Sequence, residues 1–491
     1  MARIIKSNAL TFALCAVITM TAAIFYAAYP LLSDVAYSVA ADVRILAGAI
    51  PYTDILETNP PLMFWFTMPA IWISQLFNTQ SELMFVVYTL AINAASLGFA
   101  WYLSGFASRT RYERNYLAAT LALITCFAMA FGFGQREYFT AVLLLPYLAS
   151  CNVRLEGGKI PFVAKIAVGV VAGVALAFKP YFLFIPLCVE TNALLATRNW
   201  KSVFRTDVVV GTAMVAIYPF LVWSLYPQYF TDILPMITLT YGAYKIPFLQ
   251  LLQTTSVLLF LAIAAGSLIL KKGNTIPSRS FNIWFFAGIG GLLSYLFQAK
   301  GFPYHMVPAL TFALTSFFLQ VRILPRPLLQ MLAYLGFAVC VVAGLSNYAT
   351  ETRSRAAAYD DLLASTNPKR MMVFSADIGM AFPFLTARKI EWVGHFQSLW
   401  MLPAVNQGAV SGTEATTLVA KIANLVSADL EHFHPDFVIV DNRRIARSQP
   451  DYQLGFIQQF SQSLAFVKSW QSYKLAKKTD NFELWQRTAS F

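Results

Sequence analysis

Long apolar runs recur along the first 346 residues of this chain, and they limit its fold more than any other feature. Eleven runs cover roughly residues 9–32, 84–106, 116–133, 139–151, 163–178, 181–196, 207–225, 249–270, 281–298, 305–321 and 327–346. A run of about 20 apolar residues can cross the hydrocarbon core of a bilayer as a helix. The chain is only 12% charged, whereas soluble chains are about 25% charged. The sequence therefore predicts a polytopic α-helical membrane protein with about 11 transmembrane helices.

The distribution of basic residues predicts the orientation of these spans. If the N-terminus is cytoplasmic and every run crosses once, the cytoplasmic loops contain RTRYERN, residues 154–165, TRNWKSVFR, KKGNTIPSR and VRILPR. Together with Arg3 and Lys6, they hold 16 of the 21 basic residues of segment 1–346. This is the positive-inside bias of membrane proteins. The net charge of +12 then follows from topology, and it requires no nucleic-acid partner.

Segment 61–77 is apolar but short, and Pro69 interrupts it. The orientation above holds only if this segment does not cross the membrane, so we predict a re-entrant or interfacial helix. The alternative is a true span with a compensating irregularity elsewhere.

The charges left on the outer face gather in a few loops. The basic ones are Arg44, Arg136, Lys179, Lys245 and Lys300, and the acidic ones are Asp34, Asp42, Asp54, Glu57, Glu82, Glu137 and Asp232. They lie in the first outer loop and in the strings GFGQREY, FKPYF, YPQYFTDILPMITLTYGAYKIPF and QAKGFPYH. Charges beside apolar spans are costly unless they are paired or hydrated. The sequence therefore predicts a polar cavity on the outer face.

A short helix that lies on the membrane, followed by a rigid turn, is expected in the first outer loop. Asp34 and Arg44 share one face of this helix at helical spacing. A diproline then restricts Asn59 to a non-helical backbone before the next helix begins. The turn thereby holds Asp54 and Glu57 at the rim of the predicted cavity.

Each of these residues also has an ordinary structural interpretation. Asp34 can cap the helix that follows the first span, and Arg136 can form an interfacial ion pair with Glu137. Tyrosines of the outer loops can belong to the aromatic belt at the membrane surface. The side chains that can simply extend to the lipid head groups are Lys179, Lys300 and His305. The predicted site depends on the joint occurrence of all these residues on one face.

An ordered set of motifs runs through about the first 330 residues. An Asp directly follows the first span, and then come a helix ending in GAIPY, an acidic turn, PPL, and a second acidic loop. This layout resembles the GT-C superfamily of polytopic glycosyltransferases, in the branch of protein O-mannosyltransferases and bacterial lipid A aminoarabinose transferases. Bacterial members of that branch carry strings similar to GQRE, KPY and KGFPYH. The resemblance is strongest over residues 34–65.

The resemblance implies transfer of one sugar from a polyprenyl-phosphate carrier to an acceptor at the outer face of the bacterial inner membrane, with inversion at the anomeric carbon. It implies that Asp34 is the catalytic base and that Glu137 is a second acid. The family's usual Asp-Glu pair is absent, because Val35 follows Asp34, and Asp54 or Glu57 are open as substitutes. Members of the family use a divalent metal or none. Clustered acids would suit Mg²⁺ or Mn²⁺, but the four histidines form no metal set and we predict no metal ligands.

The residue types fit this chemistry independently. A partly desolvated carboxylate can take the proton of an attacking hydroxyl, and positioned cations stabilise a leaving phosphate. The predicted substrate-binding residues are Arg44, Tyr52, Asn59, Arg136, Lys179, Lys245, Lys300 and His305. The predicted partners are the lipid-linked donor, a lipid, glycan or protein acceptor, and membrane lipids.

Residues 347–491 have the composition of a soluble domain, and they hold 28 of the 60 charged residues. RMMVFSAD (370–377), KIEWVG (389–394) and DFVIVDN (436–442) are predicted to be short strands. Residues 418–430 are expected to form an amphipathic helix, and a hairpin is expected around 479–481. We therefore predict a transmembrane domain over 1–346 and a small periplasmic α/β domain over 347–491.

The predicted function is that of a membrane glycosyltransferase, and two alternatives remain. A transporter or flippase of a lipid-linked glycan would place polar groups at mid-span on broken helices, often with an internal repeat. A membrane assembly factor acting through its C-terminal domain would tolerate Asp34→Asn.

Overall fold

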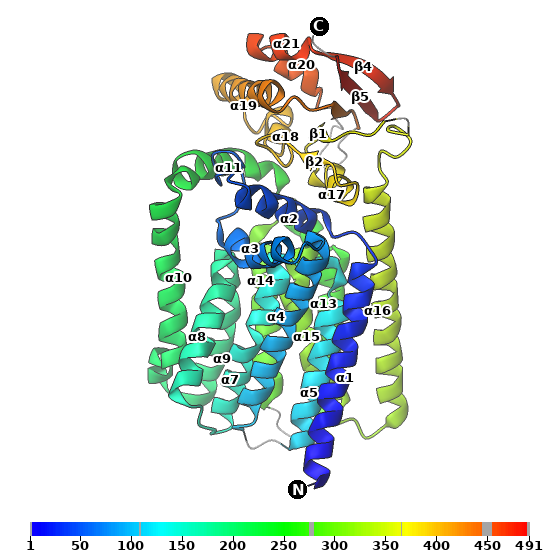
Figure 1. Ribbon diagram of the computed structural model, residues 1–491. Helices are drawn as coiled ribbons and strands as arrows, with labels where there is room; N and C mark the ends of the chain where they lie inside the picture. Colours follow the sequence, from blue (N-terminus) through cyan, green and yellow to red (C-terminus); the bar gives the residue numbers. More distant parts are fainter. Residues whose placement is uncertain (1, 108–109, 274–278, 365, 444–453, 489–491) are drawn as a thin grey trace. The chain divides into compact units, whose positions relative to one another are not determined.

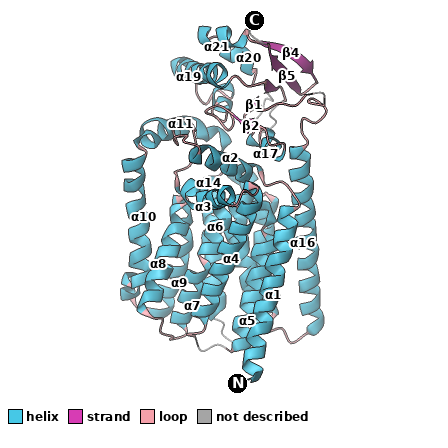
Figure 2. Cartoon of the chain, viewed as in Figure 1, coloured by secondary structure: helices cyan, strands magenta, loops and turns pink. Residues whose placement is uncertain are grey.

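The chain folds mainly into helices, and a small sheet lies near its C-terminus (Figures 1 and 2). The computed structural model describes residues 2–107, 110–273, 279–364, 366–443 and 454–488. Among them, the segments long and apolar enough to span a membrane are Asn8–Ala27, Ser81–Ser104, Arg136–Leu155, Pro180–Thr197, Thr206–Leu225, Thr255–Lys272, Pro303–Val321 and Pro327–Ala356. The predicted polytopic α-helical membrane fold is thereby confirmed, while the exact number of spans stays a prediction.

The chain divides into two compact units. The first, which we call the helical unit, comprises Met1–Ala28, Leu83–Leu221 and Lys245–Ala349. The second, the mixed unit, comprises Tyr29–Glu82, Val222–Tyr244 and Thr350–Phe491. The C-terminal segment thus shares a unit with the first outer loop. The domain division at residue 346 stays a prediction.

The apolar runs of the sequence coincide with the helices of the helical unit. These are α1 (Ala2–Ala27), α4 (Ser81–Ser104), α5 (Arg111–Leu123), α6 (Arg136–Leu143), α7 (Leu145–Leu155), α8 (Phe162–Ala177), α9 (Phe184–Thr197), α10 (Thr206–Leu225), α12 (Phe248–Leu252), α13 (Thr255–Gly273), α14 (Arg279–Gln298), α15 (Val307–Val321) and α16 (Pro327–Ala356). Helices α6, α7 and α15 are almost entirely buried, whereas α10 and α16 expose most of their apolar side chains. An apolar helix exposed in this way suits a lipid surround.

Glycines on α14 allow two neighbouring helices to approach closely. A Cβ atom added to Gly291 would lie 2.6 Å from the backbone N of Ala309 on α15. A Cβ added to Gly290 would lie 2.5 Å from the Cα of Ile185 on α9. Small residues at helix contacts are the usual means of close packing in membranes. The glycines of α14 thus fix its position between α9 and α15.

Helices α1 and α4 run antiparallel. The ring of Phe12, near the start of α1, lies 4.7 Å from that of Trp101, near the end of α4. Asn115 of α5 contacts both of these ends, because it accepts a hydrogen bond from Trp101 and donates one to Asn8. The chain between α1 and α4 therefore leaves and returns at the same end of the helical unit. It must cross the membrane an even number of times, which agrees with a helix over 61–77 that does not cross.

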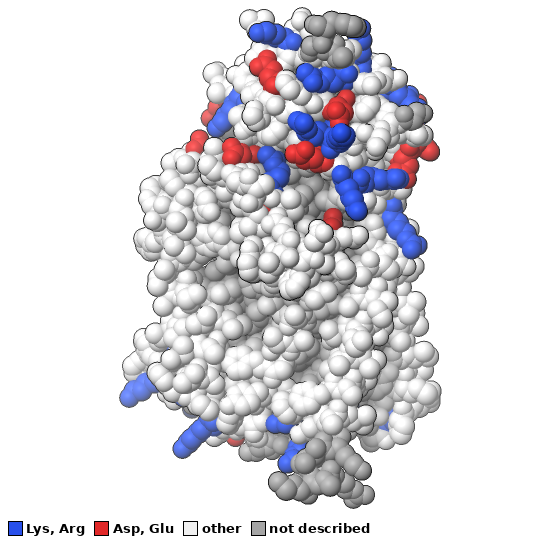
Figure 3. Space-filling view, in the orientation of Figure 1, with Lys and Arg blue, Asp and Glu red and all other residues white. Residues whose placement is uncertain are grey.

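The described residues of the basic loops predicted to be cytoplasmic lie at one end of the helical unit, where α1 begins (Figure 1). Arg322 of the loop VRILPR pairs with Glu113 of the loop RTRYERN at 2.8 Å. The visible side of the helices is white between its ends in Figure 3, and Lys and Arg side chains appear at the end of these loops. This arrangement is the one that the orientation argument requires.

The mixed unit contains a five-stranded sheet of order β2-β1-β3-β5-β4. Its strands are β1 (Arg370–Phe374), β2 (Glu391–Trp392), β3 (Phe437–Asp441), β4 (Tyr473–Lys478) and β5 (Phe482–Arg487). Strands β1, β2 and β3 are parallel, and β4 and β5 form an antiparallel hairpin. The helices of the C-terminal segment are α17 (Phe384–Ala387), α18 (Leu402–Asn406), α19 (Gly412–Phe433), α20 (Phe456–Phe460) and α21 (Leu464–Trp470). The predicted strands, helix and hairpin of this region are confirmed.

Two further helices of the mixed unit form the first outer loop, namely α2 (Ser33–Leu46) and α3 (Leu62–Leu76), and α11 (Leu234–Thr240) follows later in the chain. Helices α2 and α3 pack together around a buried carboxyl group. Asp42 is 0% exposed, and its Oδ2 lies 2.6 Å from the Thr67 hydroxyl. That hydroxyl also lies 2.8 Å from the Met63 carbonyl, which can only accept. Burial raises the pKa of Asp42 well above its ordinary value, and the hydrogen bond that Thr67 donates to the carboxyl group opposes this rise only in part.

We predict that Asp42→Asn stabilises the protein at alkaline pH. The pKa of Asp42 is raised in the folded state, so the unfolded chain loses its proton first and wild-type stability falls as pH rises above about 4. This loss is about 1.4 kcal/mol per pH unit until the folded pKa is reached. The Asn side chain can still hydrogen-bond with Thr67, and it cannot ionise. Thermal unfolding in detergent should show a gain for the variant that is larger at pH 8 than at pH 5. An equal difference at both pH values would contradict this, and Asp232→Asn is the exposed control.

Candidate functional site

A buried carboxylate lies at the start of α6, in the string GFGQREY. Gly134 has a positive φ of 76°, which a residue with a side chain adopts only at a cost, and Gln135 is extended. The helix therefore begins at Arg136 and places Glu137 in its first turn. Glu137 is 0% exposed. Its Oε1 lies 2.5 Å from Lys179 Nζ and 3.6 Å from His305 Nε2.

The backbone before Pro180 aims Lys179 at this carboxylate. Pro180 excludes the helical conformation from the preceding residue, and Lys179 is accordingly extended, with φ −152° and ψ 133°. Its side chain is 12% exposed, and Nζ lies 3.4 Å from His305 Nε2. Lys179 and His305 therefore point into the helical unit, toward Glu137. Neither extends to the head groups, which was their alternative interpretation.

A strained loop brings two more lysines to this cluster. Lys300 lies between Ala299 and Gly301, whose φ angles are 53° and 70°, and a left-handed Ala is held only by its surroundings. The Ala299 carbonyl accepts a hydrogen bond of 2.8 Å from the backbone N of Ile246, which sets Lys245 beside Lys300. Burial, together with the charges of Lys179 and Arg136, lowers the pKa of Lys300 to about 7.

This cluster, which we call the Glu137 cluster, contains more positive than negative charge. Its members are Arg136, Glu137, Lys179, Lys245, Lys300 and His305. In the part of the chain that the structure describes, Glu137 Oε2 and His305 Nδ1 are buried without a hydrogen-bond partner. Buried polar atoms are usually partnered, and a low-dielectric surround favours an anion beside excess cations. The arrangement therefore suits a bound anionic group that also carries hydrogen-bond donors.

The other predicted site residues lie in the first outer loop, within the mixed unit. Glu57 is 5% exposed, and its Oε1 accepts hydrogen bonds from the backbone N and side-chain Nδ2 of Asn59, at 2.8 and 2.5 Å. The Tyr52 hydroxyl donates to the Asn59 carbonyl at 2.7 Å. Asp54 Oδ2 accepts from the backbone N of Ile50 at 2.7 Å. The turn is thus rigid, as the diproline predicts, and its polar groups hold one another.

Asp34 lies in the first turn of α2, whose N-cap is Leu32. The interpretation of Asp34 as the capping residue is therefore wrong. Arg44, in the last turn of the same helix, donates to the Gly394 carbonyl at 2.6 Å and lies 4.4 Å above the Trp392 ring. These contacts tie α2 to the C-terminal segment. Substrate binding by Arg44 stays a prediction.

No family model and no curated protein matches this sequence, but its structure is similar to solved ones. One of them is the structure of the ArnT protein of Cupriavidus metallidurans bound to undecaprenyl phosphate. Its sequence is 13% identical to this one, and the two structures align with a TM-score of 0.54 over 99% of this chain and 98% of ArnT. The same protein in the apo state is 12% identical, with a TM-score of 0.56 over 98% of each chain. ArnT is a lipid A aminoarabinose transferase of the GT-C superfamily. This chain has the GT-C fold.

The fold agreement extends through the C-terminal segment, because nearly the whole of both chains aligns. The arabinofuranosyltransferase AftD of mycobacteria aligns with 97% of this chain and 40% of its own, at 11% identity and a TM-score of 0.43, which is too low to bear on the fold. The resemblance drawn from the motifs is thereby confirmed for the fold. The roles of individual residues stay predictions.

Two tyrosines of the outer-loop strings, Tyr52 and Tyr138, are too deeply buried to offer their rings to a ligand. Tyr52 and Tyr138 are 2% and 1% exposed, so their rings belong to the packed interior. The described residues include no group of three or more His, Cys, Asp or Glu side chains that could hold a metal ion.

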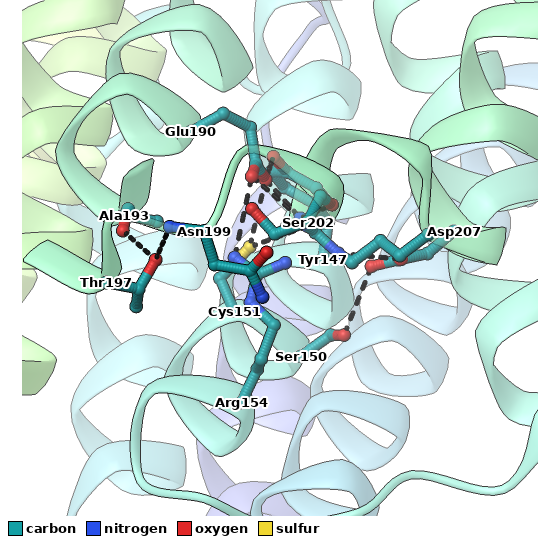
Figure 4. Close-up of polar contacts among 11 residues, drawn as sticks. Tyr147, Ser150, Cys151, Arg154, Glu190, Ala193, Thr197, Asn199, Ser202 and Asp207 are labelled. Carbon is teal, nitrogen blue, oxygen red and sulfur yellow. Dashed lines mark hydrogen bonds and ion pairs between the residues drawn. The ribbon is translucent and has the colours of Figure 1, made fainter. Parts of the chain in front are cut away.

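A second polar network lies at the opposite end of the helical unit and was missed by the sequence analysis (Figure 4). Glu190 of α9 receives a bidentate ion pair from Arg205 at 2.7 and 2.6 Å, and Tyr147 also donates to it. Arg205 Nε reaches Asp207 Oδ1 at 2.8 Å, and Arg154 approaches Glu190 at 3.5 Å. The sequence signal that could have indicated this network is Glu190 itself, a carboxylate inside the apolar run 181–196. The network joins α7, α9 and α10 to the loop before α10.

We predict that Arg205→Ala destabilises the protein by about 3–5 kcal/mol, because it leaves Glu190 and Asp207 as buried charges without their cation. Arg198→Ala, in the same loop but exposed, should change stability by less than about 0.5 kcal/mol. Pairing Arg205→Met with Glu190→Gln should recover part of the loss. Chemical unfolding in mixed micelles measures all three variants. Equal effects of the two single Ala substitutions would show that the network does not stabilise the fold.

Proposed function

We propose that this chain is a membrane glycosyltransferase. It transfers one sugar from a polyprenyl-phosphate donor to a hydroxyl of a lipid, glycan or protein acceptor, with inversion, at the extracytoplasmic face of the bacterial inner membrane. The observation that carries the proposal is the Glu137 cluster, a cation-rich and buried group at the ends of apolar helices. An ArnT of the same fold was solved with undecaprenyl phosphate, and the lipid phosphate of such a donor is the kind of anion that this cluster suits.

On the donor side, the cations hold the phosphate and stabilise its departure. Lys179 and Lys300 approach the charged oxygens, and Arg136 and Lys245 add to the positive field. Glu137 orients Lys179 and offsets part of the positive charge of the cluster. As the bond from the anomeric carbon to the phosphate oxygen breaks, the leaving phosphate gains a negative charge. Fixed cations in a low-dielectric site stabilise that charge more strongly than water would.

On the acceptor side, a carboxylate takes the hydroxyl proton while the oxygen attacks the anomeric carbon. Asp34 is the predicted base, and Asp54 and Glu57 are the predicted assisting acids. Each transfer forms one glycosidic bond and releases one polyprenyl phosphate, and the proton passes to Asp34. The hydrogen bonds of Asp54 and Glu57 within their turn favour a role for these two acids in shaping the loop around the acceptor.

The placement of charge in the helical unit favours transfer over transport. A transporter is expected to carry polar groups at mid-span on broken helices. Here the Glu137 cluster lies at one end of the helices and the Glu190 network at the other.

Substituting the predicted catalytic carboxylates should abolish transfer while the fold persists. We expect Asp34→Asn and Glu137→Gln each to lower kcat by at least about 100-fold. The assay follows labelled sugar from undecaprenyl-phosphate donors to lipid, glycan and peptide acceptors. Asp232→Asn and Glu156→Gln are the matched controls and should retain wild-type rates. Wild-type activity in both catalytic variants would remove this assignment.

Donor binding should weaken as pH rises, because Lys300 loses its proton near pH 7. The donor is a phosphodiester and keeps one negative charge throughout, so the titration of Lys300 alone sets the slope. We expect affinity for undecaprenyl-phosphate mannose or glucose to fall about tenfold from pH 6.5 to pH 8.5. Lys300→Arg should remove this dependence, since Arg stays charged. Lys201→Arg, at the other end of the unit, should leave it in place, and a wild-type affinity that does not change with pH would refute the phosphate role of Lys300.

A further inference from the structure

The loop after strand β2 carries a histidine that is fixed by a buried carboxylate. His395 Nδ1 lies 2.6 Å from Asp429 Oδ1, and the backbone N of His395 donates to Asp429 Oδ2 at 2.9 Å. The side chain of Asp429 is 1% exposed and that of His395 is 22% exposed. Gly394 precedes the histidine with a φ of 103°, and a Cβ there would lie 2.9 Å from Asp429 Oδ2. Glycine thus lets the loop pass directly over the carboxylate.

This geometry fixes the tautomer of the imidazole. A carboxylate accepts the proton of the ring nitrogen that faces it, so Nδ1 is the donor and Nε2 carries the lone pair. Within the described part of the chain, no residue forms a hydrogen bond with Nε2. Nε2 of neutral His395 is therefore a fixed hydrogen-bond acceptor that reaches the surface of the mixed unit.

Two contacts with the first outer loop hold the same segment in place. The backbone N of Leu56 donates to the His395 carbonyl at 2.9 Å, and Arg44 holds the neighbouring Gly394 carbonyl, as described above. The histidine also follows the carboxyl end of a parallel strand, where α/β sheets most often bind ligands. The position is thus preorganised before any ligand arrives.

Several carboxylates lie on the segments that contact the loop carrying His395. The charged groups near this segment are Arg44 of α2, Asp54 and Glu57 of the following turn, Glu391 of β2 and Asp429 of α19. Glu391 is exposed, Asp54 is half-buried, and the half-buried ring of Phe396 lies beside His395. A ligand that fits this edge donates several hydrogen bonds and offers an apolar face. Saccharides have both properties.

We propose that His395, oriented by Asp429, binds a hydroxyl of a saccharide on the acceptor and so positions that acceptor. The inference rests on the proposed function and names the acceptor class. His395 is a positioning residue: it breaks no bond, and its Nε2 accepts a hydrogen bond that the acceptor sugar donates.

The test compares two substitutions that separate fixing the loop from binding the sugar. In His395→Asn, the amide can still donate to Asp429 but nothing replaces Nε2. The matched control is His432→Asn, on the exposed surface of α19. Transfer rates are measured with two acceptors, lipopolysaccharide and the lipid-free core oligosaccharide released from it. Comparing the two acceptors shows whether the protein recognises the saccharide or the lipid. We expect His395→Asn to raise the acceptor KM about tenfold with both acceptors, with kcat and donor KM unchanged.

A binding measurement without turnover separates this inference from the proposed function. The chain has four histidines, so labelling of the histidine ring carbons gives four resonances, and His395→Asn identifies one of them. Core oligosaccharide should shift that resonance in the wild type and leave the resonance of His432 unchanged. A shift of the His395 resonance without any sugar transfer would contradict the proposed function and support this inference. Transfer with no shift, with an unchanged acceptor KM in His395→Asn, or with a peptide as the sole acceptor, would overturn it.

Discussion

The ion pair between Glu137 and Lys179 is the interaction on which the candidate donor site depends. Both groups lie among apolar helices, where an unpaired charge would be costly. One carboxylate cannot neutralise the cations around it, and burial together with these neighbouring charges lowers the pKa of Lys300 to about 7. The protein thus keeps a strained charge balance that an anionic ligand would relieve. A purely structural ion pair would not need further lysines at its edge.

Backbone restrictions, rather than side-chain packing, place most of these polar groups. Proline sets the extended conformation of Lys179, and glycine permits the turn before Arg136. Ala299 accepts a left-handed conformation so that Lys300 can face inward. In the mixed unit, Gly394 allows the approach to Asp429. The left-handed conformation of Ala299 costs some folding free energy, and all four backbone features lie next to a charged or titratable group.

The sequence predicted those features that depend on local pattern. Apolar period and length predicted the helices, and β-branched and aromatic runs predicted the strands around 371, 391 and 438. It did not predict which charges would meet, because Glu137, Lys179 and His305 come from three separate segments, and only packing of α6, α8 and α15 decides their distances. The Glu190 network was missed for the same reason, because the sequence alone equally allows Arg205 to be one of the basic residues of a cytoplasmic loop. His395 was considered only as a metal ligand and set aside, although its partner Asp429 lies 34 residues away within an amphipathic helix.

The two polar clusters differ in a way that bears on their roles. The Glu137 cluster is rich in cations and buried, so its chemistry suits an anion. His395 offers a ring nitrogen as an acceptor on a partly exposed side chain, which suits a neutral ligand that donates hydrogen bonds. A group-transfer enzyme needs both kinds of recognition, since its donor carries a phosphate and its acceptor carries hydroxyls. A protein that only moved a lipid-linked glycan would need one set of contacts for one ligand, and a second set of opposite character would have no use.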